Sequence, residues 1–202
     1  MFVLNQSQTI ANQFLAELRD VETQKDRMRF RKNLERLGEI LAYEISKTLT
    51  YEQKEIKTPL SSTLATVPAE QPVIVAVLRA SLPFYQGFLN FFDQAESGFI
   101  GAFREEGDGE ITINLGYHAS PNLEGKTVIL ADPMLATGKS FIQSIQKLLD
   151  HGTPRKIHIA AAFAAPEGID HINTHLDLPH SFWLGALDER LNHQSYSPRI
   201  GR

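Results

Sequence analysis

Apolar residues recur with a helical spacing in the N-terminal part of the chain. The clearest pattern runs through Arg27–Leu49, where apolar residues recur every third or fourth position and most charged residues fall on other faces. The apolar positions are Leu34, Leu37, Leu41 and Ile45. A weaker pattern of the same kind predicts a helix within Gln6–Leu18. The segment Thr58–Pro72 is rich in Thr, Ser and Pro, and we expect it to be a connection.

Beyond this segment the pattern changes to short apolar runs separated by helical stretches. Val73–Leu78 is continuously apolar and mostly branched, which is typical of a strand covered on both faces. Further strands are predicted at Gly98–Phe103, Ile111–Tyr117, Thr127–Ala131, Ile157–Phe163 and Phe182–Leu187. Helical patterns separate several of them, at Pro83–Phe92, Lys139–Asp150 and Glu167–His175. Strands that alternate with helices predict an α/β fold with a mostly parallel sheet flanked by helices.

The segment Glu105–Glu110 contains Gly-Asp-Gly and is predicted to be the tip of a β-hairpin arm that projects from the core. The chain has 202 residues, which suits a single domain. We expect that domain to consist of an N-terminal helical part, about residues 1–57, and a core, about residues 73–196. An apolar fraction of 42% and a charged fraction of 22% are typical of a soluble protein with a hydrophobic core.

Charge and cysteine content exclude several classes of function. The net charge of -4 argues against a general nucleic-acid binder, because no basic excess exists to neutralise phosphates. The absence of cysteine excludes disulfides, thiolate metal sites and a cysteine nucleophile. The N-terminus shows no basic region followed by an apolar one, and no apolar run is long enough to span a membrane. We therefore expect a cytoplasmic protein with no membrane partner.

The most informative segment is the junction between the strand Thr127–Ala131 and the helix that follows it. Thr137, Gly138, Lys139 and Ser140 open that helix, so its unpaired N–H groups and the positive end of its dipole would face an anion. Glycine lets the backbone approach such a ligand closely. Asp132 follows the strand and is suited to accept hydrogen bonds from sugar hydroxyls or to hold a Mg²⁺-bound water.

Two alternatives to this anion site exist at the same junction. The helix could be capped by Thr137 or Ser140 and bind no ligand, and the short TGKS string does not by itself decide against this. A P-loop kinase is the second alternative, because GKS ends the Walker A pattern. That pattern needs a glycine five positions before Gly138, where this chain has Pro133. The kinase hypothesis therefore fails.

Three strings in the same order give the chain a resemblance to a known family. They are LRA at residues 78–80, DPMLATG at residues 132–138 and AAPEG at residues 164–168. With them the chain resembles uracil phosphoribosyltransferases from about Arg27 to Tyr196. The resemblance implies a type I phosphoribosyltransferase fold, usually as a homodimer or higher homo-oligomer. It also implies transfer of phosphoribosyl from 5-phosphoribosyl-1-pyrophosphate (PRPP) to uracil, giving UMP and pyrophosphate.

The resemblance assigns roles to individual residues. Arg79, Arg104 and Asp132 are the expected catalytic residues: the two arginines would bind the leaving pyrophosphate, and Asp132 would orient the ribose. Without the resemblance, Arg79 would be interpreted as a surface ion pair. Mg²⁺ is expected to bind mainly through PRPP, with no metal site of the protein's own. The PRPP-binding residues are expected to be Arg79, Arg104, Asp132, Pro133, Met134, Leu135, Ala136, Thr137, Gly138, Lys139 and Ser140. Uracil is expected to contact Met134, Ala136 and Tyr196.

His171 and His175 raise the question of a metal site of their own, because residues four apart share a helix face. No third ligand is obvious in the sequence, so solvated helix residues are the preferred interpretation.

The chain departs from the family pattern at three places. The family usually has glycine where this chain has Ser81, and glycine or alanine where it has Lys139, which would strengthen phosphate binding. After Tyr196 the family's GDAGD segment, which contributes to the uracil site, is absent. A non-catalytic relative that binds PRPP or a nucleotide, acting as a sensor or interaction protein, is therefore the alternative to the enzyme.

Overall fold

The computed structural model describes residues 1–106 and 111–191 of the chain, and the side chains of residues 102–116 are left aside. The helices are α1 (Ala11–Arg19), α2 (Arg27–Ser46), α3 (Leu82–Leu89), α4 (Lys139–Leu148) and α5 (Pro166–His175). The strands are β1 (Phe2–Val3), β2 (Tyr51–Lys57), β3 (Ser62–Pro68), β4 (Val73–Leu78), β5 (Ser97–Glu106), β6 (Ile111–Ala119), β7 (Thr127–Ala131), β8 (Met134–Leu135), β9 (Lys156–Ala164) and β10 (His180–Leu187).

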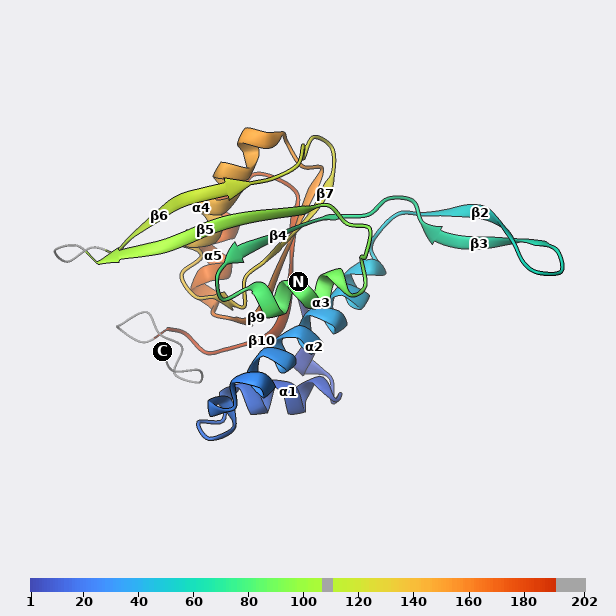
Figure 1. Cartoon of the computed structure of the whole chain (residues 1–202). Coiled ribbons are helices and arrows are strands. Elements are labelled where there is room, and N and C mark those ends of the chain that lie inside the picture. The colour runs from blue at the N-terminus through green and yellow to red at the C-terminus, as the bar shows by residue number, and fades with distance from the viewer. Residues whose placement is uncertain (107–110, 192–202) are drawn as a thin grey trace.

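The main sheet is mostly parallel and covered by helices on both faces. Its strand order is β1-β10-β9-β7-β4-β5-β6, and β8 pairs with the end of β9. Only the pair β5–β6 is antiparallel among these described strands. From β4 the chain continues to β5 on one side, whereas β7, β9 and β10 lie on the other side. The strand order therefore reverses between β4 and β7, at the centre of the sheet (Figure 1).

Each face of the sheet has its own hydrophobic core. On one face Ile74 and Ala76 of β4 pack with buried residues of α1, α2 and α3. On the other face Val73, Val75 and Val77 pack with buried residues of α4 and α5. Successive residues of a strand point to opposite faces, so a strand in this position needs an apolar residue at every position. This confirms β4, which has the predicted bounds.

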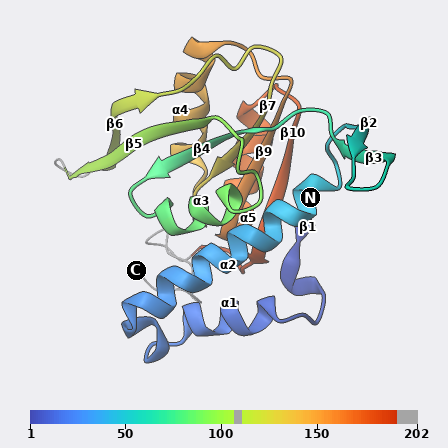
Figure 2. The ribbon, with the colours of Figure 1, turned by 45° about the vertical axis from the view of Figure 1, so that its right-hand side comes forward.

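The N-terminal helices pack on the first of these faces, as Figure 2 shows for α1 and α2. The apolar positions predicted for α2 from its helical spacing are all buried. The helix begins at Arg27 because the Asp26 carboxylate caps it, accepting hydrogen bonds from the N–H groups of Met28 (3.0 Å) and Arg29 (3.1 Å). The weaker pattern corresponds to α1, which begins at Ala11 and not at Gln6.

The prediction of a plain connection at Thr58–Pro72 is wrong, because β3 occupies Ser62–Pro68. Likewise, the helical part does not extend to residue 57, since β2 follows α2 and pairs with β3 in an antiparallel hairpin. This hairpin projects from the rest of the chain (Figure 1). Every residue of β2 is exposed, so the strand lacks the alternation of apolar and polar residues that marks a half-buried strand.

The second hairpin agrees with the prediction. β5 and β6 are antiparallel partners on either side of the expected tip at Glu105–Glu110, and residues 107–110 of that tip lie outside the described part. None of the described helices is both long and apolar enough to cross a membrane. The division of the chain into parts of one domain stays a prediction.

Candidate active site

Two loops meet at the carboxyl edge of the sheet, where the strand order reverses. β7 ends at Ala131 and is followed by Asp132. β4 ends at Leu78 and is followed by Arg79. The two strands are neighbours, with Ala76 beside Ala131. Open α/β sheets bind ligands in the crevice at this point. The predicted Asp132 and Arg79 therefore come from adjacent strands at the edge that binds ligands.

Backbone hydrogen bonds fasten the loop after β7 to the end of β9. The N–H of Asp132 donates to the carbonyl oxygen of Ala160 (3.1 Å). The carbonyl oxygen of Pro133 accepts from the N–H of Phe163 (3.0 Å), and β8 then pairs with the last residues of β9. Within the loop, the Asp132 carboxylate accepts a hydrogen bond from the N–H of Met134 (3.2 Å). The backbone of the loop is thus held by a strand of the core.

The side chains of the predicted loop residues have different surroundings. Pro133 and Leu135 are buried, so their side chains pack against the rest of the protein and not toward a ligand. Met134, Ala136 and Thr137 are half-buried. Asp132 and Ser140 are half-buried as well, and Lys139 is exposed, so these side chains and the backbone are accessible to a ligand at this edge.

Gly138 forms the junction between the loop and α4. Its φ of 76° lies in the left-handed region, which favours glycine. Gly138 is the N-cap residue, and no side chain in the described ranges hydrogen-bonds the N–H groups of the first turn. Capping by Thr137 or Ser140 is therefore not observed. Lys139 is exposed beside these N–H groups, which carry the positive end of the helix dipole.

Arg79 begins the loop between β4 and α3, after a cis peptide bond from Leu78. Its side chain is exposed, and it forms no ion pair with any residue of the described ranges. The interpretation of Arg79 as part of a surface ion pair is therefore not supported. A guanidinium in this position can bind two oxygens of a phosphate at once.

The sequence that forms this site also matches a known family along almost the whole chain. The sequence model of the uracil phosphoribosyltransferase family matches residues 5–201. The chain belongs to this family. A uracil phosphoribosyltransferase of Porphyromonas gingivalis is 41% identical over 194 residues, which cover 96% of this chain and 90% of that protein. One of Pyrococcus furiosus is 35% identical over 187 residues, 91% of this chain and 79% of that protein.

Solved structures agree with the predicted fold. The AQ2163 protein of Aquifex aeolicus has a TM-score of 0.82 at 33% identity, covering 95% of this chain and 89% of that one. A hypoxanthine-guanine phosphoribosyltransferase of Bacillus anthracis has a TM-score of 0.50 at 19% identity, covering 78% of each chain, which is a likeness of fold alone. The resemblance stated from the LRA, DPMLATG and AAPEG strings, and the type I phosphoribosyltransferase fold, are confirmed.

Ser81 replaces a glycine that is usual in uracil phosphoribosyltransferases, and the structure accommodates it. Its φ of -72° and ψ of -15° are helical values that any residue adopts. The hydroxyl is buried and donates to the carbonyl oxygen of Val77 (2.5 Å). The side chain therefore connects the end of β4 to the first turn of α3 and does not obstruct the loop.

The structure describes the remaining predicted site residues, Arg104 and Tyr196, only in part. Arg104 lies on β5, where its backbone is opposite Ile113 of β6, beyond the point at which Gly101 pairs with Leu78 of β4. The strand therefore carries Arg104 past the same sheet edge, while its side chain lies outside the described residues. Tyr196 also lies outside them. Of the predicted site residues, the structure thus places the loop after β7 and Arg79 at the ends of neighbouring strands.

His171 and His175 share a face of α5, with ring centroids 4.2 Å apart. The Nδ1 of His175 is 2.8 Å from the carbonyl oxygen of His171 and bonds to it. Partial burial, His175 and Lys139 lower the pKa of His171. The described ranges contain no group of three or more His, Cys, Asp or Glu side chains arranged to hold a metal ion. The pair lies near Lys139, the first residue of α4, and its interpretation as solvated helix residues stays a prediction.

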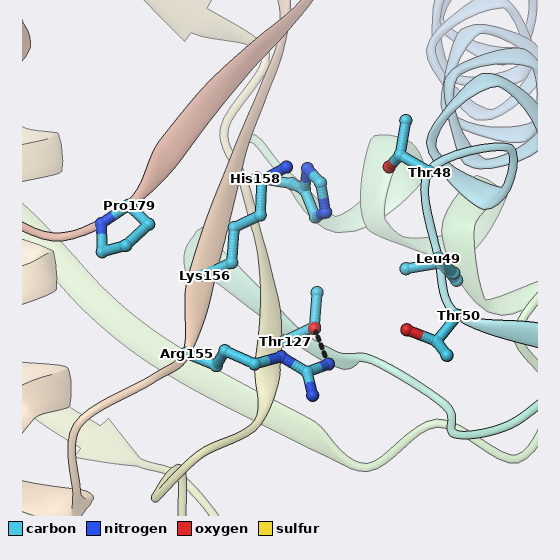
Figure 3. A pocket seen from close by; sticks show the side chains of 8 residues that line it. All are labelled: Thr48, Leu49, Thr50, Thr127, Arg155, Lys156, His158 and Pro179. Carbon is cyan, nitrogen blue, oxygen red and sulfur yellow. Dashed lines mark hydrogen bonds between the residues drawn. The ribbon is translucent and has the colours of Figure 1, made fainter.

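A cavity of about 220 Å³ lies at the opposite edge of the sheet (Figure 3). It is lined by the first residues of β7 and β9, Thr127 and Lys156, and by the turn after α2. The Arg155 guanidinium beside it donates to the Thr127 hydroxyl (3.0 Å) and also pairs with Glu70. Because Asp132 and the loop after β7 are at the carboxyl edge, this cavity is separate from the candidate active site.

Proposed function

We propose that this chain transfers phosphoribosyl from PRPP to uracil, giving UMP and pyrophosphate. The observation that carries the proposal is the loop Asp132–Ser140. It is fastened to β9, opens a helix without a side-chain cap, and follows the strand next to the one that ends before Arg79. In the reaction N1 of uracil bonds to C1′ of PRPP, the C1′–O bond breaks, and pyrophosphate leaves with the electron pair. N1 gives up its proton, which passes to the departing pyrophosphate or to solvent. No covalent intermediate with the protein is needed.

The 5′-phosphate is expected to bind at the N-terminus of α4. The first-turn N–H groups would donate to its oxygens, with hydroxyls from Thr137 and Ser140 beside them and the Lys139 ammonium nearby. Gly138 allows the phosphate to approach the backbone closely. The binding energy gained at this remote group would hold C1′ in position for attack.

Charge separates at the other end of the ribose. The transition state resembles an oxocarbenium ion, so positive charge grows on the sugar while negative charge grows on pyrophosphate. Arg79, together with Arg104, would stabilise the leaving group. The Asp132 carboxylate would orient the ribose hydroxyls and offset charge at the sugar. Its hydrogen bond from Met134 N–H keeps one carboxylate oxygen fixed for this role.

Mg²⁺ bound through PRPP would add positive charge at the pyrophosphate oxygens. Asp132 at the sheet edge fits an ion carried by the substrate, because its carboxylate could hold a water of the ion. Mg²⁺ usually keeps several waters and is bound by few carboxylates together with substrate phosphates.

A direct assay tests the proposed activity. The protein is incubated with labelled uracil, PRPP and Mg²⁺, and UMP and pyrophosphate are both measured. We expect the two products in equal amounts. A protein that binds PRPP but forms no UMP would contradict the proposal and favour a non-catalytic PRPP-binding relative.

Replacing Asp132 by asparagine is expected to lower kcat by about tenfold or more, because the neutral amide no longer offsets the charge that develops on the ribose. The hydrogen bond from Met134 N–H should persist, since the amide oxygen can still accept it. Steady-state kinetics measure the effect. Asp150→Asn, an exposed aspartate beyond the far end of α4, is the matched control. Unchanged turnover in Asp132→Asn would remove the role given to Asp132.

A homo-oligomer is part of the same proposal. An isolated two-stranded hairpin has marginal stability in water, yet all residues of β2 are exposed and Leu60, in the turn after it, is 98% exposed. A second copy of the chain would cover this hairpin. We expect light scattering to give at least twice the mass of one chain; a monomer at micromolar concentration would contradict this. The cytoplasmic location stays a prediction.

A further inference from the structure

Gly168 lies in the first turn of α5, in a helical position where glycine is unexpected. Glycine in a helix costs about 1 kcal/mol relative to alanine, and Gly168 has no positive φ that would require it. A Cβ atom built on Gly168 would lie 2.6 Å from the carbonyl oxygen of Ala136 and 2.9 Å from the Leu135 side chain. The space beside Gly168 is therefore filled by the loop after β7.

The contact between the two segments is reciprocal. A Cβ atom on Gly138 would lie 2.7 Å from the carbonyl oxygen of Gly168 and 3.2 Å from its Cα. In addition, the N–H of Ala165 donates to the carbonyl oxygen of Leu135 (2.8 Å). The start of α5 and the loop Asp132–Gly138, the phosphate loop, thus touch backbone to backbone, with the buried Leu135 side chain beside the contact.

Such a contact fixes the position of the loop. Cβ atoms essentially never approach backbone oxygen closer than 3.0 Å, so a side chain at residue 168 would force the loop or α5 to move by several tenths of an ångström. α5 is held in the second core through the buried Ile172. The pairing of the loop with β9 ends at Leu135. The following residues, from Ala136 to Gly138, form the segment that would move away from its place at the phosphate.

We propose that Gly168 is a positioning residue of the PRPP site, which sets the position of the loop Asp132–Gly138 by direct backbone packing without touching the substrate. The inference rests on the proposed function. It gives the AAPEG segment a specific role, because Ala165 and Gly168 form the support on which the phosphate loop rests. The sequence pattern offers no sign of this role, since the segments in contact lie far apart along the chain.

The test is Gly168→Ala in the full chain, with the KM for PRPP, the KM for uracil, kcat and thermal stability all measured. A sub-ångström displacement of the loop is expected to raise the KM for PRPP about tenfold, with the KM for uracil changed much less. Gly87→Ala is the control, because its Cβ would meet the Glu35 carbonyl oxygen at 2.1 Å where α3 crosses α2. This variant should lose stability while its KM for PRPP stays as in the wild type. An unchanged KM for PRPP in Gly168→Ala, or an equal rise in both variants, would overturn the inference.

A measurement on the wild-type protein covers the case in which Gly168→Ala does not fold. PRPP binding should slow hydrogen exchange at the N–H of Ala165, which bonds to the loop but does not contact the ligand, and leave the N–H of Phe92 in the turn after α3 unaffected. If the N–H of Ala165 exchanges at the same rate with and without bound PRPP, the inference that α5 positions the loop is refuted. A wild-type protein that neither binds PRPP nor forms UMP refutes the proposed function instead, so the two failures are distinguishable.

Discussion

Replacing Arg79 by alanine is expected to lower kcat/KM for PRPP by about 10²- to 10³-fold, the usual cost of removing one group that stabilises developing negative charge. Arg79 is exposed and has no ion-pair partner within the described ranges, so its removal leaves no buried charge unpaired. The free energy of unfolding should therefore change by less than about 0.5 kcal/mol, as for other surface substitutions. Loss of activity without loss of stability would show that Arg79 serves the substrate and not the fold.

Two variants make this experiment specific. Arg79→Lys keeps the charge but cannot form two parallel hydrogen bonds to a phosphate, and should recover only part of the lost activity. Lys147→Ala removes an exposed cation near the other end of α4, where its partner Asp150 is 3.9 Å away, and should leave kcat/KM unchanged. Steady-state kinetics at varied PRPP and urea unfolding provide the two readouts. Wild-type activity in Arg79→Ala would mean that the pyrophosphate is bound elsewhere.

Acidification from pH 6.5 towards pH 4 is expected to remove as much as about 3 kcal/mol from the free energy of unfolding through one histidine, since each pKa unit corresponds to about 1.4 kcal/mol. Burial, and then the nearby Lys156 ammonium, lower the pKa of His158 from 6.5 to about 4. The unfolded chain therefore binds a proton in this range that the folded chain does not. His158 contributes its stability fully above pH 6.5 and loses it progressively as the pH falls to about 4.

The hydrogen bonds of His158 oppose protonation independently of burial. The indole N–H of Trp183 donates to Nδ1 (2.8 Å), and the Ser181 hydroxyl lies 2.9 Å from the same nitrogen. A proton on Nδ1 would face the indole N–H and break that bond. Replacing His158 by glutamine removes the titratable group, so the pH dependence of unfolding should become shallower.

Urea unfolding between pH 7.5 and pH 4.5 measures the free energy of unfolding of the wild type and of His158→Gln. The fluorescence of Trp183 serves as the probe, because it is the single tryptophan of the chain. The other acidic and histidine groups titrate equally in the two proteins, so the difference between the curves belongs to His158. Parallel curves for the wild type and His158→Gln would contradict the lowered pKa.

Sequence patterns predicted the parts of this fold that are buried on both sides. β4 and β7 have the predicted bounds, because a central parallel strand is apolar at nearly every position and a polar residue marks where it ends. The β2–β3 hairpin was missed for the opposite reason: its strands face solvent and pair only with each other. No burial pattern can mark such strands in a sequence.

The site was predictable where its chemistry is local. Asp132, Gly138 and the start of α4 are neighbours along the chain, so a short string identifies them. The support by Gly168 depends on a contact between segments that only the packing of α5 brings together. The loop between β4 and α3 accommodates Ser81 because the Ser81 hydroxyl donates a hydrogen bond to the carbonyl oxygen of Val77. The sequence alone does not reveal this hydrogen bond.

The pairing of β8 with β9 fixes the number of residues between Asp132 and β8. Met134 packs toward the core under α1–α3, whereas Leu135 is buried in the core under α4 and α5. A shift by one residue along β9 would exchange these two side chains between the faces of the sheet. Insertion or deletion of a residue between Asp132 and Met134 would therefore disrupt both cores at once. Engineering of substrate preference in this first half of the loop is restricted to changes of side chain at constant length.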